Sequence, residues 1–179
     1  NIKDDSFIIH EDDAMKFDYS KFKNSKLRIV GNLPYNISTP LLFHLLSYKD
    51  VIKNMYFMLQ KEVVERICAK SGTKEYGRLS VMLQCYCDVE SMLIIKPDAF
   101  YPSPKVDSAI VRLTKKKTPI ISDSEFLKFN AIVKAAFSKR RKMLRNSLSG
   151  FNFSEKIKKE IDFTRRPETL SIDEFAKLL

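Results

Sequence analysis

The residues of this chain best suited to chemistry are four in a row, Asn32-Leu33-Pro34-Tyr35. The side-chain oxygen of Asn32 and the carbonyls of Leu33 and Pro34 can accept hydrogen bonds, and proline stiffens the backbone that carries them. The Tyr35 ring can stack on a flat molecule. Several acceptors beside an aromatic ring suit a planar base with an exocyclic amine. Asparagine and proline are also common in ordinary turns, so these residues alone leave a plain turn open.

The flanking residues predict how this motif is held. Ile29 and Val30 form a β-branched run that ends at Gly31, which predicts a strand. Thr39 and Pro40 are suited to the N-cap and the first position of a helix. The motif is therefore expected in a tight turn from strand to helix, and the open ends of strands are where α/β folds bind ligands.

Composition narrows the class of protein. The chain has 179 residues, 44% of them hydrophobic, which is enough for one ordinary domain and a small second one. No apolar run reaches the length of a membrane span, and three cysteines without a CxxC pair indicate reduced thiols. Two histidines without ligand spacing do not support a metal site. We expect a monomeric cytoplasmic protein with no metal and no membrane partner.

Positive charge is concentrated in the last third of the chain. Residues 1–114 carry 16 basic and 14 acidic side chains, whereas residues 115–179 carry 16 and 8, within a net charge of +10. This distribution indicates a polyanionic partner. Nucleic acid is favoured over an anionic membrane, because the basic residues do not follow one amphipathic helix.

Strand and helix patterns alternate through the first two thirds of the chain. Apolar runs predict strands at 55–59, 89–95 and 106–114, and apolar periodicity predicts helices up to about 48, from 63 to 72 and over 79–86. This alternation predicts an α/β fold with a sheet of mainly parallel strands. The last two strands have no helix between them, which predicts an antiparallel pair at one edge.

Two other stretches could serve a binding site. Phe7-Ile8-Ile9 predicts a short buried strand, and Asp13 in the acidic cluster after it could bond an adenine amine or a ribose, although a solvated loop is the plainer interpretation. Prolines hold the loop that begins Phe100-Tyr101-Pro102 extended. Its aromatic residues could form a second wall for a base or cap the core.

The end of the chain predicts a small helical domain. Residues 115–119 have the charge and the terminal proline of a linker, so we divide the chain into 1–118 and 119–179. Apolar periodicity beyond the linker predicts one helix capped by Ser124 and a second that starts at Ser154. A third starts at Ser171, whose capping box Glu174 completes.

Six motifs in order resemble the ribosomal RNA adenine N6-dimethyltransferase family over nearly the whole chain. Each motif is weak alone, but the ordered set is specific. The motifs are Asp13-Ala14-Met15, Gly31-Asn32-Leu33-Pro34-Tyr35-Asn36-Ile37-Ser38, Gln60-Lys61-Glu62-Val63, Gly77-Arg78-Leu79-Ser80, Phe100-Tyr101-Pro102-Ser103-Pro104-Lys105-Val106-Asp107-Ser108 and Phe137-Ser138-Lys139-Arg140-Arg141-Lys142. The second half is more similar to the small-subunit rRNA enzymes than to the large-subunit ones.

The resemblance implies a Rossmann-like methyltransferase sheet followed by a small all-helical RNA-binding domain. It implies S-adenosylmethionine as methyl donor and two adjacent adenosines near the 3′ end of small-subunit rRNA as substrate. Each adenosine would receive two methyl groups. The partner would be the immature 30S subunit, and the role would lie in ribosome biogenesis.

The resemblance also assigns roles to residues. Asn32 and the carbonyls of Leu33 and Pro34 would hold the target N6, and Tyr35 and Phe100 would stack the base. Asp13 and Ala14, together with Asn32, would meet the adenine of the donor. The residues expected to contact RNA are Lys105, Lys139, Arg140, Arg141, Lys142 and Arg145.

One part of the family pattern is not in this sequence. The family begins with a strand, a glycine-rich loop for the donor's methionine and an acidic residue for its ribose. The four glycines here, Gly31, Gly72, Gly77 and Gly150, are scattered. We therefore expect the chain to start at the third strand of the sheet, and these 179 residues alone to bind the donor poorly and to be inactive.

Three alternatives remain open from the sequence. A non-catalytic small-subunit assembly factor would carry the same basic charge and base pocket. A large-subunit rRNA methyltransferase and a DNA adenine N6-methyltransferase would share the Asn-Leu-Pro-Tyr chemistry. The helical tail and the Phe100 loop argue against the DNA enzyme.

Overall fold

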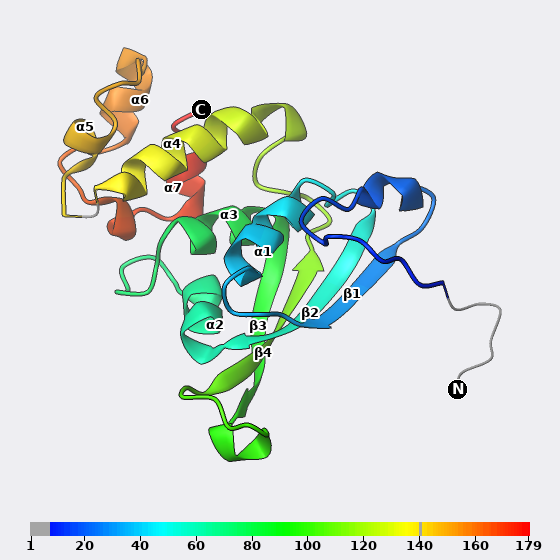
Figure 1. The fold of residues 1–179 in the computed structure, drawn as a ribbon. Coiled ribbons are helices and arrows are strands. Elements are labelled where there is room, and N and C mark those ends of the chain that lie inside the picture. The colour runs from blue at the N-terminus through cyan, green and yellow to red at the C-terminus, as the bar shows by residue number, and fades with distance from the viewer. Residues whose placement is uncertain (1–7, 140) are drawn as a thin grey trace.

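A computed structural model describes residues 8–139 and 141–179. Within them the chain forms a four-stranded sheet in the order β1-β2-β4-β3, with helices on one of its faces (Figure 1). The strands are β1 (Leu27–Asn32), β2 (Ile52–Gln60), β3 (Cys87–Ile95) and β4 (Ser108–Lys115). The α/β fold class is confirmed.

The sheet is mixed. β1 runs parallel to β2, with Asn32 opposite Met58, whereas β4 runs antiparallel to both β2 and β3. The expected antiparallel edge pair is confirmed. Strands β1, β2 and β3 run in one direction and β4 alone runs against them, so the expectation of mainly parallel strands is confirmed for the described residues. The position of β4 was not expected: it returns by a hairpin-like loop and inserts between β2 and β3.

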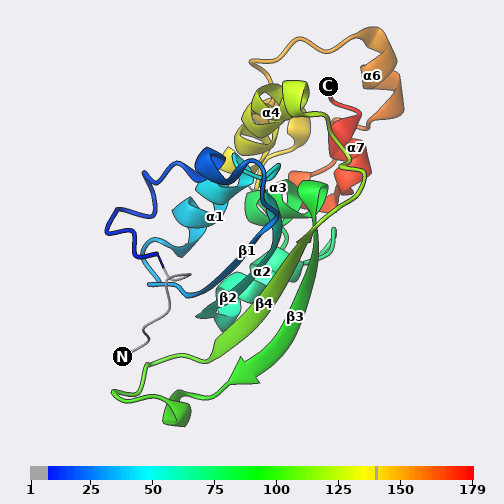
Figure 2. The same ribbon diagram turned by 90° about the vertical axis from the view of Figure 1, so that its right-hand side faces the viewer.

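Helices α1 (Ser38–Leu46), α2 (Lys61–Cys68) and α3 (Arg78–Tyr86) cover one face of the sheet (Figure 2). Alternation along β2 explains this, because Phe57 and Leu59 are buried beneath the helices while Tyr56 and Met58 are only half-buried. No described helix covers the opposite face, where Val30 of β1 is 77% exposed.

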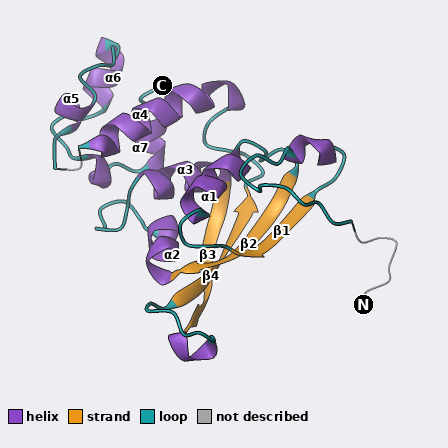
Figure 3. Cartoon of the chain, in the orientation of Figure 1, coloured by secondary structure: helices purple, strands orange, loops and turns teal. Residues whose placement is uncertain are grey.

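The remaining helices form a lobe beside α3 (Figure 3). They are α4 (Phe126–Ser138), α5 (Leu144–Ser147), α6 (Glu155–Glu160) and α7 (Ile172–Ala176), with short 3-10 turns at Tyr19–Phe22, Pro97–Ala99, Asp123–Glu125 and Pro167–Thr169. The helix α4 buries Phe129, Ile132, Val133 and Ala136, a spacing that places one apolar stripe against the core.

The connection between sheet and lobe is bonded to α3. The Lys116 N–H donates to the Tyr86 carbonyl at 2.8 Å, and the Ile120 N–H donates to the Cys85 carbonyl at 3.1 Å. One hydrophobic cluster also continues from the sheet into the lobe. The segment expected as a linker is therefore anchored at both ends, and the domain boundary at 118 stays a prediction.

Several expected element ends differ from the structure. Helix α1 begins at Ser38 rather than after Thr39, because the Leu41 N–H already donates to the Ile37 carbonyl at 2.9 Å. Ser124 does not cap α4: it lies inside the 3-10 turn Asp123–Glu125, which Ser122 caps through a capping box with Glu125. Helix α4 follows that turn directly, with Glu125 at its N-cap position and no side-chain cap. The caps Ser154 and Ser171 are confirmed.

The strand expected at Phe7-Ile8-Ile9 is wrong for its described part. Ile8 and Ile9 are 73% and 79% exposed and belong to no strand, and Phe7 lies outside the described residues. The physical reason is that a strand needs a neighbour for its backbone groups, and these residues pair with no described strand. No helix among the described residues is both long and apolar enough to span a bilayer.

Candidate active site

The Asn32-Leu33-Pro34-Tyr35 motif forms a fixed turn, which we call the elbow, at the end of β1. The Leu33 N–H donates to the Met58 carbonyl of β2 at 3.2 Å, and the Leu33 side chain is buried with 8% exposure. The Ser38 hydroxyl donates to the Tyr35 carbonyl at 3.1 Å, which ties the elbow to the first turn of α1. Sheet and helix therefore hold the motif from both ends.

The acceptors of the elbow differ in availability. The Pro34 carbonyl accepts a hydrogen bond from the Ile37 N–H at 3.2 Å, so one of its lone pairs is used within the turn. Among the described residues, none bonds to the Asn32 side-chain amide or to the Leu33 carbonyl. Asn32 is exposed. These two groups are the ones free to meet a ligand.

A pocket of about 350 Å3 opens beside the elbow. Ten residues line it: Asn32, Leu33, Pro34, Tyr35, Met58, Phe100, Tyr101, Pro102, Pro104 and Ser108. The structure thus brings the predicted acceptors together with both predicted stacking residues, although Phe100 lies 65 positions beyond Tyr35 in the sequence. The volume lies in the range of small-molecule sites, which is about 300–1,000 Å3.

The second wall of the pocket is anchored by its own contacts. The Ser103 hydroxyl donates to the Pro97 carbonyl at 2.7 Å across the loop. The Lys96 ammonium lies 2.9 Å from the Asp107 carboxylate, and the Asp107 carbonyl accepts from the Lys61 N–H at 2.9 Å. Phe100 is half-buried in this loop, while Tyr101 is fully exposed.

Sequence reasoning missed two members of the pocket. Ser108, which is 2% exposed, lies 3.3 Å from the Tyr35 hydroxyl through its own Oγ. Met58 lines the pocket because it lies opposite Asn32 where β1 and β2 pair in parallel. Ser108 falls near the start of the strand expected at 106–114, directly after the Phe100 loop, and this position could have identified it. Met58 could be identified only once the register of β2 against β1 was known.

Of the three residues expected to meet the donor, Asn32 lines this pocket, whereas Asp13 and Ala14 lie apart from it. Asp13 and Ala14 belong to a turn in which Asp13 Oδ1 accepts from the Met15 N–H at 2.9 Å and the Asp13 carbonyl accepts from the Lys16 N–H at 2.8 Å. Neither residue lines the pocket at the elbow. Their role stays a prediction.

A wider apolar depression of about 720 Å3 borders Asn32 on the uncovered face of the sheet. Its lining residues are Val30, Gly31, Asn32, Tyr56, Phe57, Met58, Met92, Leu93 and Ile110. Such a surface suits the flat, apolar part of S-adenosylmethionine. The described residues that line it carry no charge for the donor's ammonium or carboxylate, so they fit only part of that molecule.

The cations expected to contact RNA fall into two separate places. Lys139, Arg141 and Lys142 are exposed between α4 and α5, and Arg145 is exposed in α5. None of the four forms an ion pair with another described residue. Lys105 is exposed in the loop between β3 and β4. That loop lies at the end of the molecule opposite to α4 and α5 in Figures 1 and 2. Arg140 lies outside the described residues.

No group of three or more His, Cys, Asp or Glu within the described ranges could hold a metal ion. Cys85 and Cys87 are buried, and burial raises the pKa of the Cys87 thiol to about 12. Two cysteines held as neutral thiols in the core therefore contribute packing rather than nucleophilic chemistry.

The fold and the elbow together define an α/β protein with a base-sized pocket at the end of a strand. The family model of the ribosomal RNA adenine dimethylases matches residues 3–179. The chain belongs to this family.

Relatives and a solved structure agree with this assignment. The chain is 52% identical over 171 residues to the ribosomal RNA small subunit methyltransferase A of Nitrosospira multiformis, covering 95% of this chain and 66% of the relative. It is 50% identical over 175 residues to the protein of the same name from Pseudomonas aeruginosa, covering 96% and 65%. A dimethyladenosine transferase from Plasmodium falciparum superimposes with a TM-score of 0.78 at 28% identity, covering 95% of this chain and 70% of that one. The chain thus spans about two thirds of the length of these bacterial relatives.

Proposed function

We propose that this protein transfers methyl groups from S-adenosylmethionine to the N6 amines of two adjacent adenosines near the 3′ end of small-subunit rRNA. The observation that carries the proposal is the elbow, where the free Asn32 amide and Leu33 carbonyl share one pocket with Tyr35 and Phe100. The names of the bacterial relatives support the small subunit as the source of the RNA. Immature small subunits in the cytoplasm are the proposed partner.

The chemistry follows from the two acceptors. The N6 lone pair of adenine is delocalised into the ring, so the amine is a poor nucleophile. In the first transfer, hydrogen bonds from its two N–H groups to Asn32 Oδ1 and the Leu33 carbonyl favour a more pyramidal nitrogen, and they stabilise the positive charge that develops. The amine that already carries one methyl keeps one N–H for these acceptors in the second transfer. In each transfer the N–C bond forms as the methyl–sulfur bond breaks, which leaves a neutral thioether, and one N6 proton passes to solvent. The donor supplies an electrophilic methyl on a sulfonium when bound.

The aromatic side chains that line the pocket orient the base. A base that stacks on Tyr35 and Phe100 presents its amine in one direction, and holding reactants in line lowers a barrier by several kcal/mol, with an upper range of about 7–11 kcal/mol. The adenine must leave its own stack to enter, as in other enzymes that modify bases. The cations between α4 and α5 would hold the RNA backbone meanwhile.

The test compares two asparagines of the same turn in the full-length gene product. Asn32→Ala should slow single-turnover methyl transfer to small-subunit rRNA by about 100-fold or more, the usual cost of losing one such acceptor or donor. Its RNA affinity should stay within twofold. Asn36→Ala is the matched control, because Asn36 is exposed nearby but does not line the pocket.

Two outcomes would overturn the proposal. Transfer by Asn32→Ala at the wild-type rate would remove the elbow from the chemistry. Full RNA binding by a wild-type protein that transfers no methyl group to any rRNA would favour the assembly-factor alternative, which the basic surface between α4 and α5 also suits.

A further inference from the structure

A second aromatic pocket lies in the helical lobe, away from the elbow. It has a volume of about 390 Å3 and lies between α5, α6 and the segment after α6. Phe151, Phe153 and Phe163 line it and are half-buried. The ring centroid of Phe153 lies 6.1 Å from that of Phe151 and 5.2 Å from that of Phe163. We call this the lobe pocket.

The charged residues that line the lobe pocket are mostly basic. Arg145 and Lys158 line it together with one carboxylate, Asp162, which accepts hydrogen bonds from the N–H and the hydroxyl of Thr164. In the sequence, residues 139–162 carry eight lysines or arginines and three acidic residues. Lys158 pairs with the exposed Glu155 at 2.8 Å, whereas the Arg145 guanidinium has no ion-pair partner among residues 8–139 and 141–179. An anionic ligand is therefore the electrostatic complement of this site.

The pocket is held in shape by backbone contacts. The Arg145 N–H donates to the Phe163 carbonyl at 2.9 Å, and the Leu144 N–H donates to the Arg165 carbonyl at 2.9 Å. These bonds fix α5 against the segment after α6.

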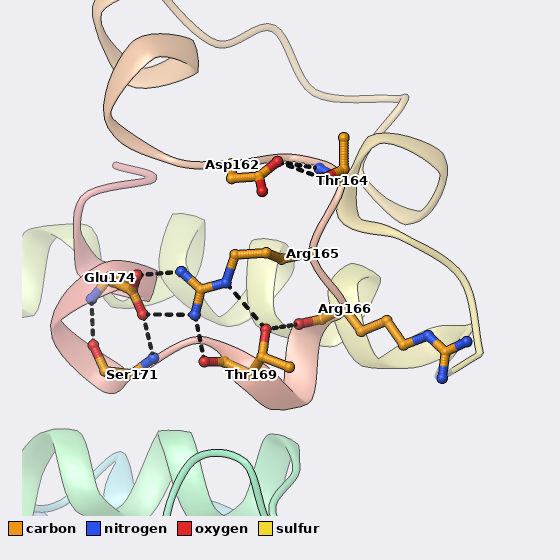
Figure 4. Close-up of polar contacts among 7 residues, drawn as sticks. All are labelled: Asp162, Thr164, Arg165, Arg166, Thr169, Ser171 and Glu174. Atoms are coloured by element: carbon orange, nitrogen blue, oxygen red, sulfur yellow. Dashed lines mark hydrogen bonds and ion pairs between the residues drawn. The ribbon is translucent and has the colours of Figure 1, made fainter.

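That segment is anchored in turn to α7 (Figure 4). The Arg165 guanidinium forms an ion pair with Glu174, and the Thr164 N–H donates to Asp162 Oδ1 at 2.8 Å. A binder that is already ordered loses less entropy when its ligand arrives. The lobe pocket therefore does not have to form on binding.

We propose that the lobe pocket binds one unstacked base of a single-stranded RNA segment, with Arg145 on the neighbouring phosphate. Single-stranded RNA is recognised by stacking of splayed bases on aromatic rings next to cations that hold the backbone, and the lobe pocket provides both. The elbow and the lobe lie in different parts of the fold (Figure 1), so this base is not the methylated adenine. The inference rests on the proposed function only for the identity of the RNA.

The test uses two fluorescein-labelled probes, a decamer of uridines and a decamer of abasic ribose phosphates. Uracil has no exocyclic amine, so it does not satisfy the acceptors at Asn32. The wild-type chain should bind the uridine decamer about tenfold more tightly than the abasic one, from stacking of a base in the lobe pocket. Phe153→Leu should abolish that preference and leave the abasic affinity unchanged. Arg145→Ala should weaken both probes and lower the salt dependence of binding by about one counterion.

Matched variants control for folding and for the elbow. Phe126→Leu removes a half-buried ring at the far end of α4 and should keep the preference. Asn32→Ala should keep it too, which separates failure of this inference from failure of the proposed function. Thermal melting checks that each variant folds.

Crosslinking gives a measurement without variants. A decamer of 4-thiouridine should crosslink to the peptide that contains residues 146–156 of the wild-type chain. Equal affinity for the two decamers, an unchanged preference in Phe153→Leu, or crosslinks confined to residues outside 145–163 would overturn the proposal.

Discussion

The Tyr35 hydroxyl lies 3.3 Å from Ser108 Oγ, and this contact joins the elbow after β1 to the first residue of β4. The two residues are 73 positions apart in the sequence. Ser108 is buried, so the contact is shielded from water on one side. The contact therefore fixes the distance between the loop that carries Phe100 and the turn that carries Asn32.

This contact should be measurable by a double-mutant cycle. Tyr35→Phe and Ser108→Ala each remove one partner and should each lower the free energy of unfolding by about 1 kcal/mol. The double variant should cost little more than either single variant, because both remove the same hydrogen bond. Chemical denaturation measures all four proteins. Strict additivity of the two losses would show that the residues do not interact.

Gly31→Ala tests how tightly the elbow is packed. A Cβ at position 31 would lie 3.2 Å from Leu33 Cδ2, closer than ordinary van der Waals contact, and 3.7 Å from the Phe57 ring. Leu33 must shift to make room, which should cost about 1 kcal/mol of stability and displace its carbonyl. Gly150→Ala is the control, because a Cβ there meets nothing within 4 Å. Equal melting temperatures for the two variants would contradict the packing argument.

The basic surface between α4 and α5 should appear in the salt dependence of RNA binding. Replacing both Arg141 and Lys142 by Ala should lower the slope of log affinity against log salt by about two, since each phosphate contact contributes about one. Filter binding of small-subunit rRNA at several salt concentrations measures this slope. Arg28→Ala with Lys53→Ala removes the same charge from exposed positions on β1 and β2 and should leave it unchanged. The same decrease in both pairs would mean that only net charge matters.

The Arg165–Glu174 pair should make stability of the lobe depend on pH. The hydrogen bond from Arg165 lowers the pKa of Glu174 below its usual 4.5. Its contribution is therefore present above pH 4.5 and is lost as the pH falls through the lowered value. Glu174→Gln should cost about 1 kcal/mol of unfolding free energy at neutral pH.

The pH trend supplies the control. The difference between wild type and Glu174→Gln should shrink in thermal melts below pH 4.5. A difference that stays constant down to pH 3 would mean that packing, rather than the carboxylate, is responsible.

Local patterns predicted most elements of this fold. Apolar runs located β2, β3 and β4, and the capping serines at 154 and 171 marked where α6 and α7 begin. The mixed order of the sheet was not predictable in this way. It depends on β4 pairing with β2, and that pairing joins residues about 50 positions apart, for which the sequence carries no local signal.

The same limit applies to the site. Asn32 and Tyr35 were identified because their chemistry is unusual in one short turn. The proline-held loop suggested Phe100 as a second wall, and the family resemblance assigned Phe100 the stacking role. Ser108 and Met58 were missed, since their place in the pocket follows from tertiary contact and register. The exposure of Ile8 and Ile9 was missed for a related reason. An apolar run favours a strand, but the strand forms only where a neighbouring strand pairs with its backbone.

Product analysis tests the central claim most directly. Small ribosomal subunits that lack the modification are incubated with the full-length protein and S-adenosylmethionine, and the digested rRNA is analysed by mass spectrometry. The account predicts N6,N6-dimethyladenosine at two adjacent positions near the 3′ end with the wild-type protein, and none with Asn32→Ala. Unmodified adenosines after incubation with the wild-type protein, or dimethylation by Asn32→Ala at the wild-type level, would contradict it.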